Sequence, residues 1–212
     1  MCSSIQLDMP GRNIEKIYLA DTYYHLYNRG INKGAIFPVK QDYAVFLNLL
    51  KRYLDTKPVK DNKGREYEWL HKKIELLAFC LMPTHYHLLV YQHKPECITS
   101  LIRAVAGAYT IYFNKKYNRR GPLFESRFRA TVINRDEYLE HISRYIHLNP
   151  SNYRGWEYSS LPYYLKKRQA GWIQPKRIMG LFRNEDEYME FLGDYREYKR
   201  SLELIKSELA DS

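Results

Sequence analysis

The stretch IELLAFCLMPTHYHLLVY, residues 74–91, decides the fold of this chain. It contains two apolar runs, Ile74 to Met82 and His85 to Tyr91, and only Pro83 and Thr84 separate them. Each run has the length of an ordinary β-strand, and proline followed by a small polar residue favours a break between strands. The stretch therefore predicts two successive strands joined by a tight connection.

Hydrophobic spacing on both sides of this pair predicts the remaining elements. A polar, Lys-rich connection between residues 55 and 73 reads as a loop, and Asn149-Pro150 stops the last helix of the series. The predicted elements are a strand over 23–28, a helix over 42–53, the strand pair, a long helix over 98–117, a strand over 128–134 and a helix over 136–148. This order predicts an α+β fold, an antiparallel sheet with helices packed on one face.

The chain of 212 residues is long enough for one well-packed domain and a small appendage. We expect a leader over residues 1–18, one domain over 19–165 and an extension over 166–212 that carries a charged amphipathic helix from about Glu185 to Leu209. The apolar runs are far shorter than the roughly 20 residues of a membrane span, and the start of the chain lacks the apolar core of a signal peptide. A cytoplasmic protein without a membrane partner is expected.

Charge and aromatic content favour a polyanionic partner. The chain has 34 Lys and Arg against 24 Asp and Glu, a net charge of +10, and it contains 21 tyrosines. Neutralising phosphates releases counterions, and aromatic rings beside cations can stack on bases. Many basic proteins bind no nucleic acid, so composition alone leaves this partner at about even odds.

Several common kinds of site are excluded by missing motifs. The three cysteines are scattered, with no close pair of the kind that binds zinc, and a disulfide framework is not expected. The sequence contains no glycine-rich phosphate loop and no G-x-S-x-G nucleophile motif.

The pair His85 and His87 is the first candidate site. Residues two apart on a strand project from the same face, so both imidazoles can bind one divalent ion and leave a position open for a phosphate oxygen. With 7 histidines in the chain, about 0.2 such pairs are expected by chance, so an ordinary structural role is a serious alternative.

The helix that ends near Asn149 is the second candidate site. A spacing of four residues places His141, Tyr145 and Asn149 on one face. Tyr145 offers a phenol, and Asn149 offers an amide oxygen suited to a hard cation such as Mg²⁺. The alternative is that Tyr145 belongs to an ordinary buried stripe.

A basic and aromatic segment, residues 114–129, is the third candidate site. Its cations could follow a nucleic-acid backbone while its aromatic rings stack on bases, although a solvated helix end and loop would have the same composition. The basic residues of this segment are Lys115, Lys116, Arg119, Arg120, Arg127 and Arg129.

Five stretches together resemble the single-tyrosine HUH transposases, and most closely the REP-associated tyrosine transposases. They occur in that family's order between about residues 20 and 165. They are YYHLYNRG (23–30), CLMPTHYHLLV (80–90), GPLFESRFRATVI (121–133), SRYIHLNP (143–150) and EYSSLPYYL (157–165).

The resemblance implies a ferredoxin-like antiparallel sheet and a role for each matching residue. His85, His87 and Asn149 correspond to the ligands of a Mg²⁺ or Mn²⁺ ion, and Tyr145 corresponds to the nucleophile that forms a 5′-phosphotyrosyl intermediate with single-stranded DNA. The implied partner is single-stranded or hairpin DNA. The DNA-binding residues expected on this basis are Asn28 and Arg29 together with the six basic residues of the third site.

Other interpretations are compatible with the same residues. The chain could be a non-catalytic protein that binds structured DNA or RNA, or a nickase of the replication or plasmid-mobilisation type. Tyr138, seven residues before Tyr145, is conceivable as a second nucleophile. The helix with Tyr145 could complete the active site of its own chain. It could also complete the active site of the other subunit in a homodimer, and the sequence agrees with both arrangements.

Overall fold

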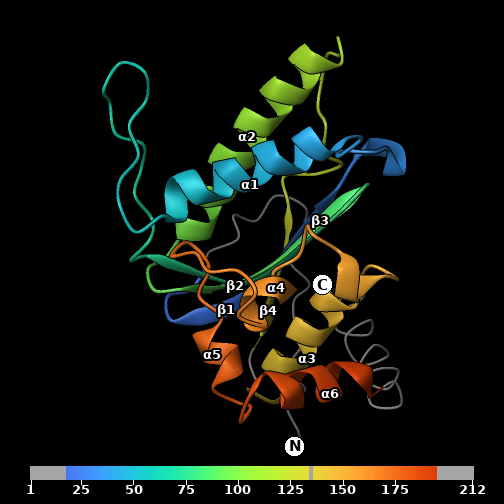
Figure 1. Cartoon of the computed structure of the whole chain (residues 1–212). Coiled ribbons are helices and arrows are strands. Elements are labelled where there is room, and N and C mark those ends of the chain that lie inside the picture. Colours follow the sequence, from blue (N-terminus) through green and yellow to red (C-terminus); the bar gives the residue numbers. More distant parts are fainter. Residues whose placement is uncertain (1–17, 134–135, 195–212) are drawn as a thin grey trace, which may run out of the picture.

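A computed structural model describes residues 18–133 and 136–194, and it shows a four-stranded antiparallel sheet with helices on both sides (Figure 1). The strand order is β2-β3-β1-β4. The strands are β1 (Thr22–Arg29), β2 (Ile74–Met82), β3 (His85–Gln92) and β4 (Arg129–Ile133). The helices are α1 (Lys40–Leu54), α2 (Cys97–Lys116), α3 (Asp136–His147), α4 (Leu161–Tyr164), α5 (Lys176–Met179) and α6 (Glu185–Gly193), with short 3₁₀ turns at Ile31–Lys33 and Tyr153–Gly155.

The hairpin of β2 and β3 confirms the strand pair predicted from residues 74–91. Met82 faces His85 in the register of the two strands, so the connection consists of Pro83 and Thr84 alone. Because β3 lies between β2 and β1, both of its edges are hydrogen-bonded within the sheet. This places the His85 and His87 strand at the centre of the sheet, where strand pairing on both sides holds it.

The sheet is covered by helices on both faces, which corrects the expectation of helices on one face. Figure 1 shows α1 and α2 on one side of the sheet and α3, α5 and α6 on the other. The reason lies in β2: Phe79 and Leu81 are buried against α1 and α2, whereas Ala78 and Cys80 are buried in the cluster that contains α3. A strand that is apolar in both directions needs a cover on each face. The fold class itself, α+β with an antiparallel sheet, is confirmed.

Helix α3 is fixed to the sheet by buried polar contacts as well as by apolar packing. The imidazole of His147 lies 2.7 Å from the hydroxyl of Tyr188 on α6 and 2.6 Å from the hydroxyl of Ser160, and all three residues are buried. Arg144 donates to the carbonyl of Phe191 at 3.0 Å and its guanidinium lies 4.0 Å from the centre of that ring. The described part of the extension after residue 165 therefore packs on α3.

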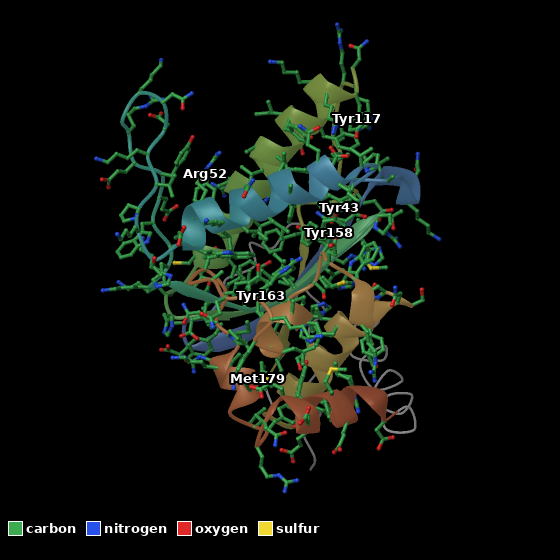
Figure 2. The ribbon with its side chains drawn as sticks, viewed as in Figure 1. Tyr43, Arg52, Tyr117, Tyr158, Tyr163 and Met179 are labelled. Carbon is green, nitrogen blue, oxygen red and sulfur yellow. The ribbon has the colours of Figure 1, made fainter. Side chains whose placement is uncertain are left out.

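Helices α1 and α2 are joined by one buried carboxylate. Asp42 accepts hydrogen bonds from Lys116 Nζ at 2.6 Å and from the hydroxyls of Tyr112 and Tyr117 at 2.8 and 2.7 Å. Figure 2 shows Tyr43 of α1 beside Tyr158, and their rings stack with centres 3.9 Å apart. These contacts connect the α1 and α2 layer to the segment that follows α3.

Two sequence expectations fall partly outside the described residues. Of the predicted leader, residues 1–17 lie outside them, and of the predicted terminal helix, residues 195–209 do. Within the described ranges, the structure contains no helix long and apolar enough to cross a membrane.

Candidate active site

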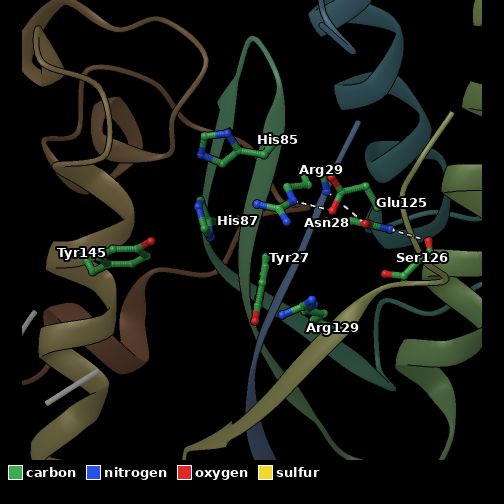
Figure 3. A pocket seen from close by; sticks show the side chains of 9 residues that line it. All are labelled: Tyr27, Asn28, Arg29, His85, His87, Glu125, Ser126, Arg129 and Tyr145. Carbon is green, nitrogen blue, oxygen red and sulfur yellow. Dashed lines mark hydrogen bonds and ion pairs between the residues drawn. The ribbon is translucent and has the colours of Figure 1, made fainter. Parts of the chain in front are cut away.

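A pocket opens on the α3 side of the sheet, where the ends of β1 and β3 meet α3 and the segment before β4 (Figure 3). Side chains from four separate parts of the chain line it. They are Tyr27, Asn28, Arg29, His85, His87, Glu125, Ser126, Arg129 and Tyr145.

The paired histidines reach this pocket because β3 alternates between the two faces of the sheet. Tyr86, between them, points to the other face and is buried in the α1 and α2 cluster. His85 stands opposite Arg29 and His87 opposite Tyr27 in the register with β1. The two imidazole centres lie 5.1 Å apart with their planes at 85°, so the rings sit side by side on the pocket wall.

The environment of both imidazoles favours their neutral form. Burial lowers the pKa of His87 well below its usual value, and the neighbouring His25 and His85 lower it further. Burial also lowers the pKa of His85; a hydrogen bond with Asn149 opposes this change and the charge of Arg29 adds to it. A neutral imidazole has a free nitrogen lone pair, which is the form that binds a cation.

Asn149 joins the histidines from the turn after α3. The helix ends at His147, two residues before Asn149, because the residue before a proline is disfavoured in helical geometry. Asn149 Oδ1 nevertheless lies 3.2 Å from His85 Nε2. Two ligands at about 2.1 Å from one Mg²⁺ in octahedral geometry lie about 3 Å apart. The pair therefore has the spacing of adjacent metal ligands.

Tyr145 faces the histidines from α3 of the same chain. Its ring stands edge-on to His87, with ring centres 5.3 Å apart and planes at 82°. In Figure 3 its hydroxyl end extends from the helix toward His87. His141, expected on the same helical face, instead bonds to Arg144 at 2.9 Å and stacks on Phe191, which turns it toward α6.

The basic residues of the pocket are Arg29 and Arg129. The Arg29 guanidinium forms an ion pair with Glu125, and Arg129 lies 6.0 Å from the centre of the Tyr27 ring. A cation beside an aromatic face can accept a nucleotide, with the phosphate on the cation and the base on the ring. Sequence reasoning did not single out Tyr27, Glu125 or Ser126. Tyr27 adjoins His87 only because β1 pairs with β3, and Glu125 and Ser126 reach the site only because the segment before β4 lies beside the end of β1.

Two residues expected to bind DNA have polar partners within the protein. Asn28 is 3% exposed, and its amide nitrogen donates to the carbonyls of Ser126 and Arg127 at 2.9 and 3.0 Å. Lys116 is paired with the buried Asp42. Both expectations relied on charge or polarity in the sequence. Along the chain, Asp42 lies more than 70 residues from Lys116, and Ser126 lies nearly 100 residues from Asn28.

Four further predicted DNA-binding residues do not line this pocket, unlike Arg29 and Arg129. Arg119 borders a second pocket with Phe113, Tyr117 and Leu123 beside the turn that follows β1. Arg127 borders a groove with Arg103 and Phe128 along α2. Lys115 and Arg120 are exposed near the end of α2.

The donor set available to a cation combines two imidazoles with one amide. Among residues 18–133 and 136–194, no cluster of three or more His, Cys, Asp or Glu side chains has the arrangement of a metal site. His85, His87 and Asn149 are candidate ligands because His85 adjoins both of the other two. The amide oxygen suits Mg²⁺ or Mn²⁺, and the imidazole nitrogens suit a transition-metal ion such as Mn²⁺.

A sheet that presents paired histidines to a tyrosine on a packed helix is the arrangement of an HUH-type fold, and a comparison with known proteins agrees with it. Residues 65–149, which include both histidines, Tyr145 and Asn149, match the model of the family described as transposase IS200-like. This segment of the chain is therefore similar to the IS200-like transposases. No protein of curated function matches the chain.

Two solved structures were compared with the fold. A REP-associated tyrosine transposase bound to a REP hairpin matches with a TM-score of 0.53 and 14% identity, over 74% of this chain and 87% of that one. A putative transposase from Deinococcus radiodurans R1 matches with a TM-score of 0.36 and 17% identity, over 66% of this chain and 95% of that one. The first likeness establishes a shared fold, and the second is too low to do so.

Proposed function

We propose that this chain is a transposase-type enzyme that cuts and rejoins single-stranded DNA through a covalent bond to Tyr145, with Mg²⁺ or Mn²⁺ as cofactor. One observation carries the proposal: a tyrosine and two candidate ligands line one pocket, and the third candidate ligand, Asn149, contacts one of them. The Tyr145 ring stands 5.3 Å from His87, while Asn149 Oδ1 lies 3.2 Å from His85 Nε2.

In the proposed reaction the Tyr145 hydroxyl gives up its proton to solvent as its oxygen bonds to the phosphorus of a DNA phosphodiester. The bond from phosphorus to the 3′ oxygen breaks, that oxygen takes a proton, and the phosphate remains on the tyrosine as the 5′ end of the downstream strand. A divalent ion, when bound, polarises the phosphate and stabilises its developing charge. Attack by a 3′-OH on the phosphotyrosine reverses the bond changes and joins strands without another energy source.

The pocket's own residues would hold and orient the DNA. His85, His87 and Asn149 would hold the ion, which would polarise the phosphate that Tyr145 attacks. Arg129 and Tyr27 would bind an adjoining nucleotide through its phosphate and base. Single-stranded or hairpin DNA is the proposed partner, and the REP hairpin bound to the solved transposase of the same fold supports it.

A covalent-adduct assay tests the proposal. Hairpin oligonucleotides with single-stranded flanks, taken from around the gene and labelled at the 3′ end, are incubated with protein and Mn²⁺ or Mg²⁺ and resolved under denaturing conditions. We expect a labelled protein band that EDTA abolishes. Tyr145→Phe should remove the band and keep hairpin binding, and Tyr138→Phe, on the same helix, is the matched control that should retain it.

Other results would assign a different function. An adduct that persists in Tyr145→Phe and disappears in Tyr138→Phe would move the nucleophile to Tyr138. Metal-independent binding with no adduct in the wild-type protein, unchanged by His85→Ala, would establish a non-catalytic binder. Nicking at an origin-like site instead of at hairpins would indicate a replication or mobilisation enzyme.

A further inference from the structure

A third histidine, His25, lies beside the pair and has no part in the proposed reaction. It lies on β1, two residues before Tyr27, and is fully buried. Its neighbours across the sheet are Leu89 and Thr131, so it sits diagonally from His87 on the same face. A buried polar ring at this position requires an explanation.

The two imidazoles meet end to end. His25 Nε2 lies 2.9 Å from His87 Nδ1, their ring centres are 5.1 Å apart, and their planes differ by 17°. The distance between the ring centres exceeds the distance between the two nitrogens by about twice the distance from the centre of an imidazole to its nitrogen. Both nitrogens therefore lie on the line between the ring centres, and the rings are nearly coplanar. This is the geometry of a linear hydrogen bond, with no space for an ion between the nitrogens.

The shared hydrogen bond fixes which nitrogen of His87 is available to the pocket. With Nδ1 turned to His25, Nε2 is the remaining nitrogen of His87. A neutral imidazole carries one proton, so Nε2 has a free lone pair only when that proton is on Nδ1. His25 Nε2 must then accept it, and the proton of His25 must be on its own Nδ1. That atom is buried and has no hydrogen-bond partner among the described residues.

We propose that His25 is a positioning residue: it accepts the Nδ1–H of His87 and thereby holds the Nε2 lone pair of His87 toward the pocket for the ion. The inference rests on the proposed function, because it assigns the second contact of a proposed ligand. Metal-bound histidines commonly donate their other N–H to a carboxylate or carbonyl, and here a second imidazole occupies that place. His85 has the corresponding contact from Thr84, whose hydroxyl lies 3.0 Å from its Nδ1.

Two substitutions at one position separate this role from a structural one. His25→Leu has a similar volume and no acceptor, whereas the amide oxygen of His25→Gln can replace Nε2 as the acceptor. The dissociation constant for Mn²⁺, measured by electron paramagnetic resonance of the free ion, should rise about 10- to 100-fold in His25→Leu. His25→Gln should restore most of the affinity. His71→Leu, on the surface loop before β2, is the control expected to match the wild type.

Thermal unfolding without metal supplies the second readout. His25→Leu removes one unpartnered buried nitrogen, His25 Nδ1, and leaves another without its partner, His87 Nδ1, so its melting temperature should stay close to that of the wild type. Weaker Mn²⁺ binding without lower stability supports positioning. Equal affinity in all variants overturns the inference and leaves the proposed function standing, as does an equal loss of affinity in the Leu and Gln variants. A wild-type protein that binds no Mn²⁺ overturns the metal-dependent function itself.

Discussion

Gly30→Ala should destabilise the protein through a backbone collision at the entrance to the active site. Gly30 follows β1, and its φ of −67° and ψ of 146° are open to any residue, so only space decides the outcome. A Cβ at this position would lie 2.3 Å from the Gly34 carbonyl oxygen and 2.8 Å from Ile36 Cγ2. Both distances are far inside van der Waals contact.

The magnitude follows from what would have to move. The carbonyl oxygen belongs to the backbone, so the collision cannot be relieved by rotating a side chain. Gly30 N donates to the Thr84 carbonyl at 2.8 Å, and the neighbouring Arg29 carbonyl accepts from Glu125 N at 3.0 Å. A shift here would disturb both the His85 hairpin and the pocket wall. Overpacking of this kind costs about 1–3 kcal/mol, and each kcal/mol lowers the melting temperature by about 2–4 °C in a chain of this size.

Urea unfolding followed by circular dichroism measures this change in the free energy of unfolding. Gly107→Ala is the matched control, because Gly107 is exposed within α2 and no atom lies within 4 Å of its added Cβ. Alanine there should stabilise the protein by about 0.5–1 kcal/mol. The two substitutions should therefore have opposite signs. A Gly30→Ala protein as stable as the wild type would refute the reasoning.

Three further predictions concern α3 and the ligand turn. Tyr188→Phe removes a buried hydroxyl 2.7 Å from His147 Nδ1 and should lower the free energy of unfolding by about 1–3 kcal/mol. The control Tyr153→Phe loses an exposed hydrogen bond from Arg154 and should change the free energy of unfolding by less than about 0.5 kcal/mol. Burial lowers the pKa of His147 from 6.5 to about 3, so between these pH values the unfolded chain binds a proton that the folded chain excludes. The free energy of unfolding should therefore fall by up to about 1.4 kcal/mol for each pH unit as the pH drops from 6.5 toward 3. His147→Gln should remove that contribution from urea-unfolding curves recorded between pH 6 and 4, and an unaltered slope would contradict the assignment. Asn149→Ala should weaken Mn²⁺ binding at least about tenfold in a titration. Asn152 is exposed in the following turn, so Asn152→Ala should leave Mn²⁺ binding unchanged. Equal affinities of the two variants would remove Asn149 from the ligand set.

Much of the fold could be read from local patterns. The strand pair at residues 74–91, the long helix after it and the helix before Asn149-Pro150 were all predicted close to their observed bounds. The choice of one covered face was wrong, because every residue of β2 except Glu75 is apolar and this masks any alternation along the strand. Only the packing of α1 and α2 against one face and α3 against the other shows that both sides of β2 are interior.

The candidate site, like the fold, was predicted in part from the sequence. Sequence alone placed His85 and His87 on one face of a strand, since side chains two apart on a strand share a face. It proposed Tyr145 and Asn149 from a spacing of four, and the structure brings both to the pocket although Asn149 lies beyond the helix end. Their catalytic roles remain proposals, with the adduct and Mn²⁺ experiments as tests.

What the sequence determined by itself was therefore the identity of the elements and the pairing of residues within each one, because hydrogen bonds and side-chain periodicity act over a few residues. The tertiary structure alone decided which elements meet. The register of β1 against β3 put His25 and Tyr27 beside His87, and the docking of α6 on α3 put Tyr188 against His147. These contacts join residues 41 to 62 positions apart, and no local pattern encodes which distant surface will cover a given face.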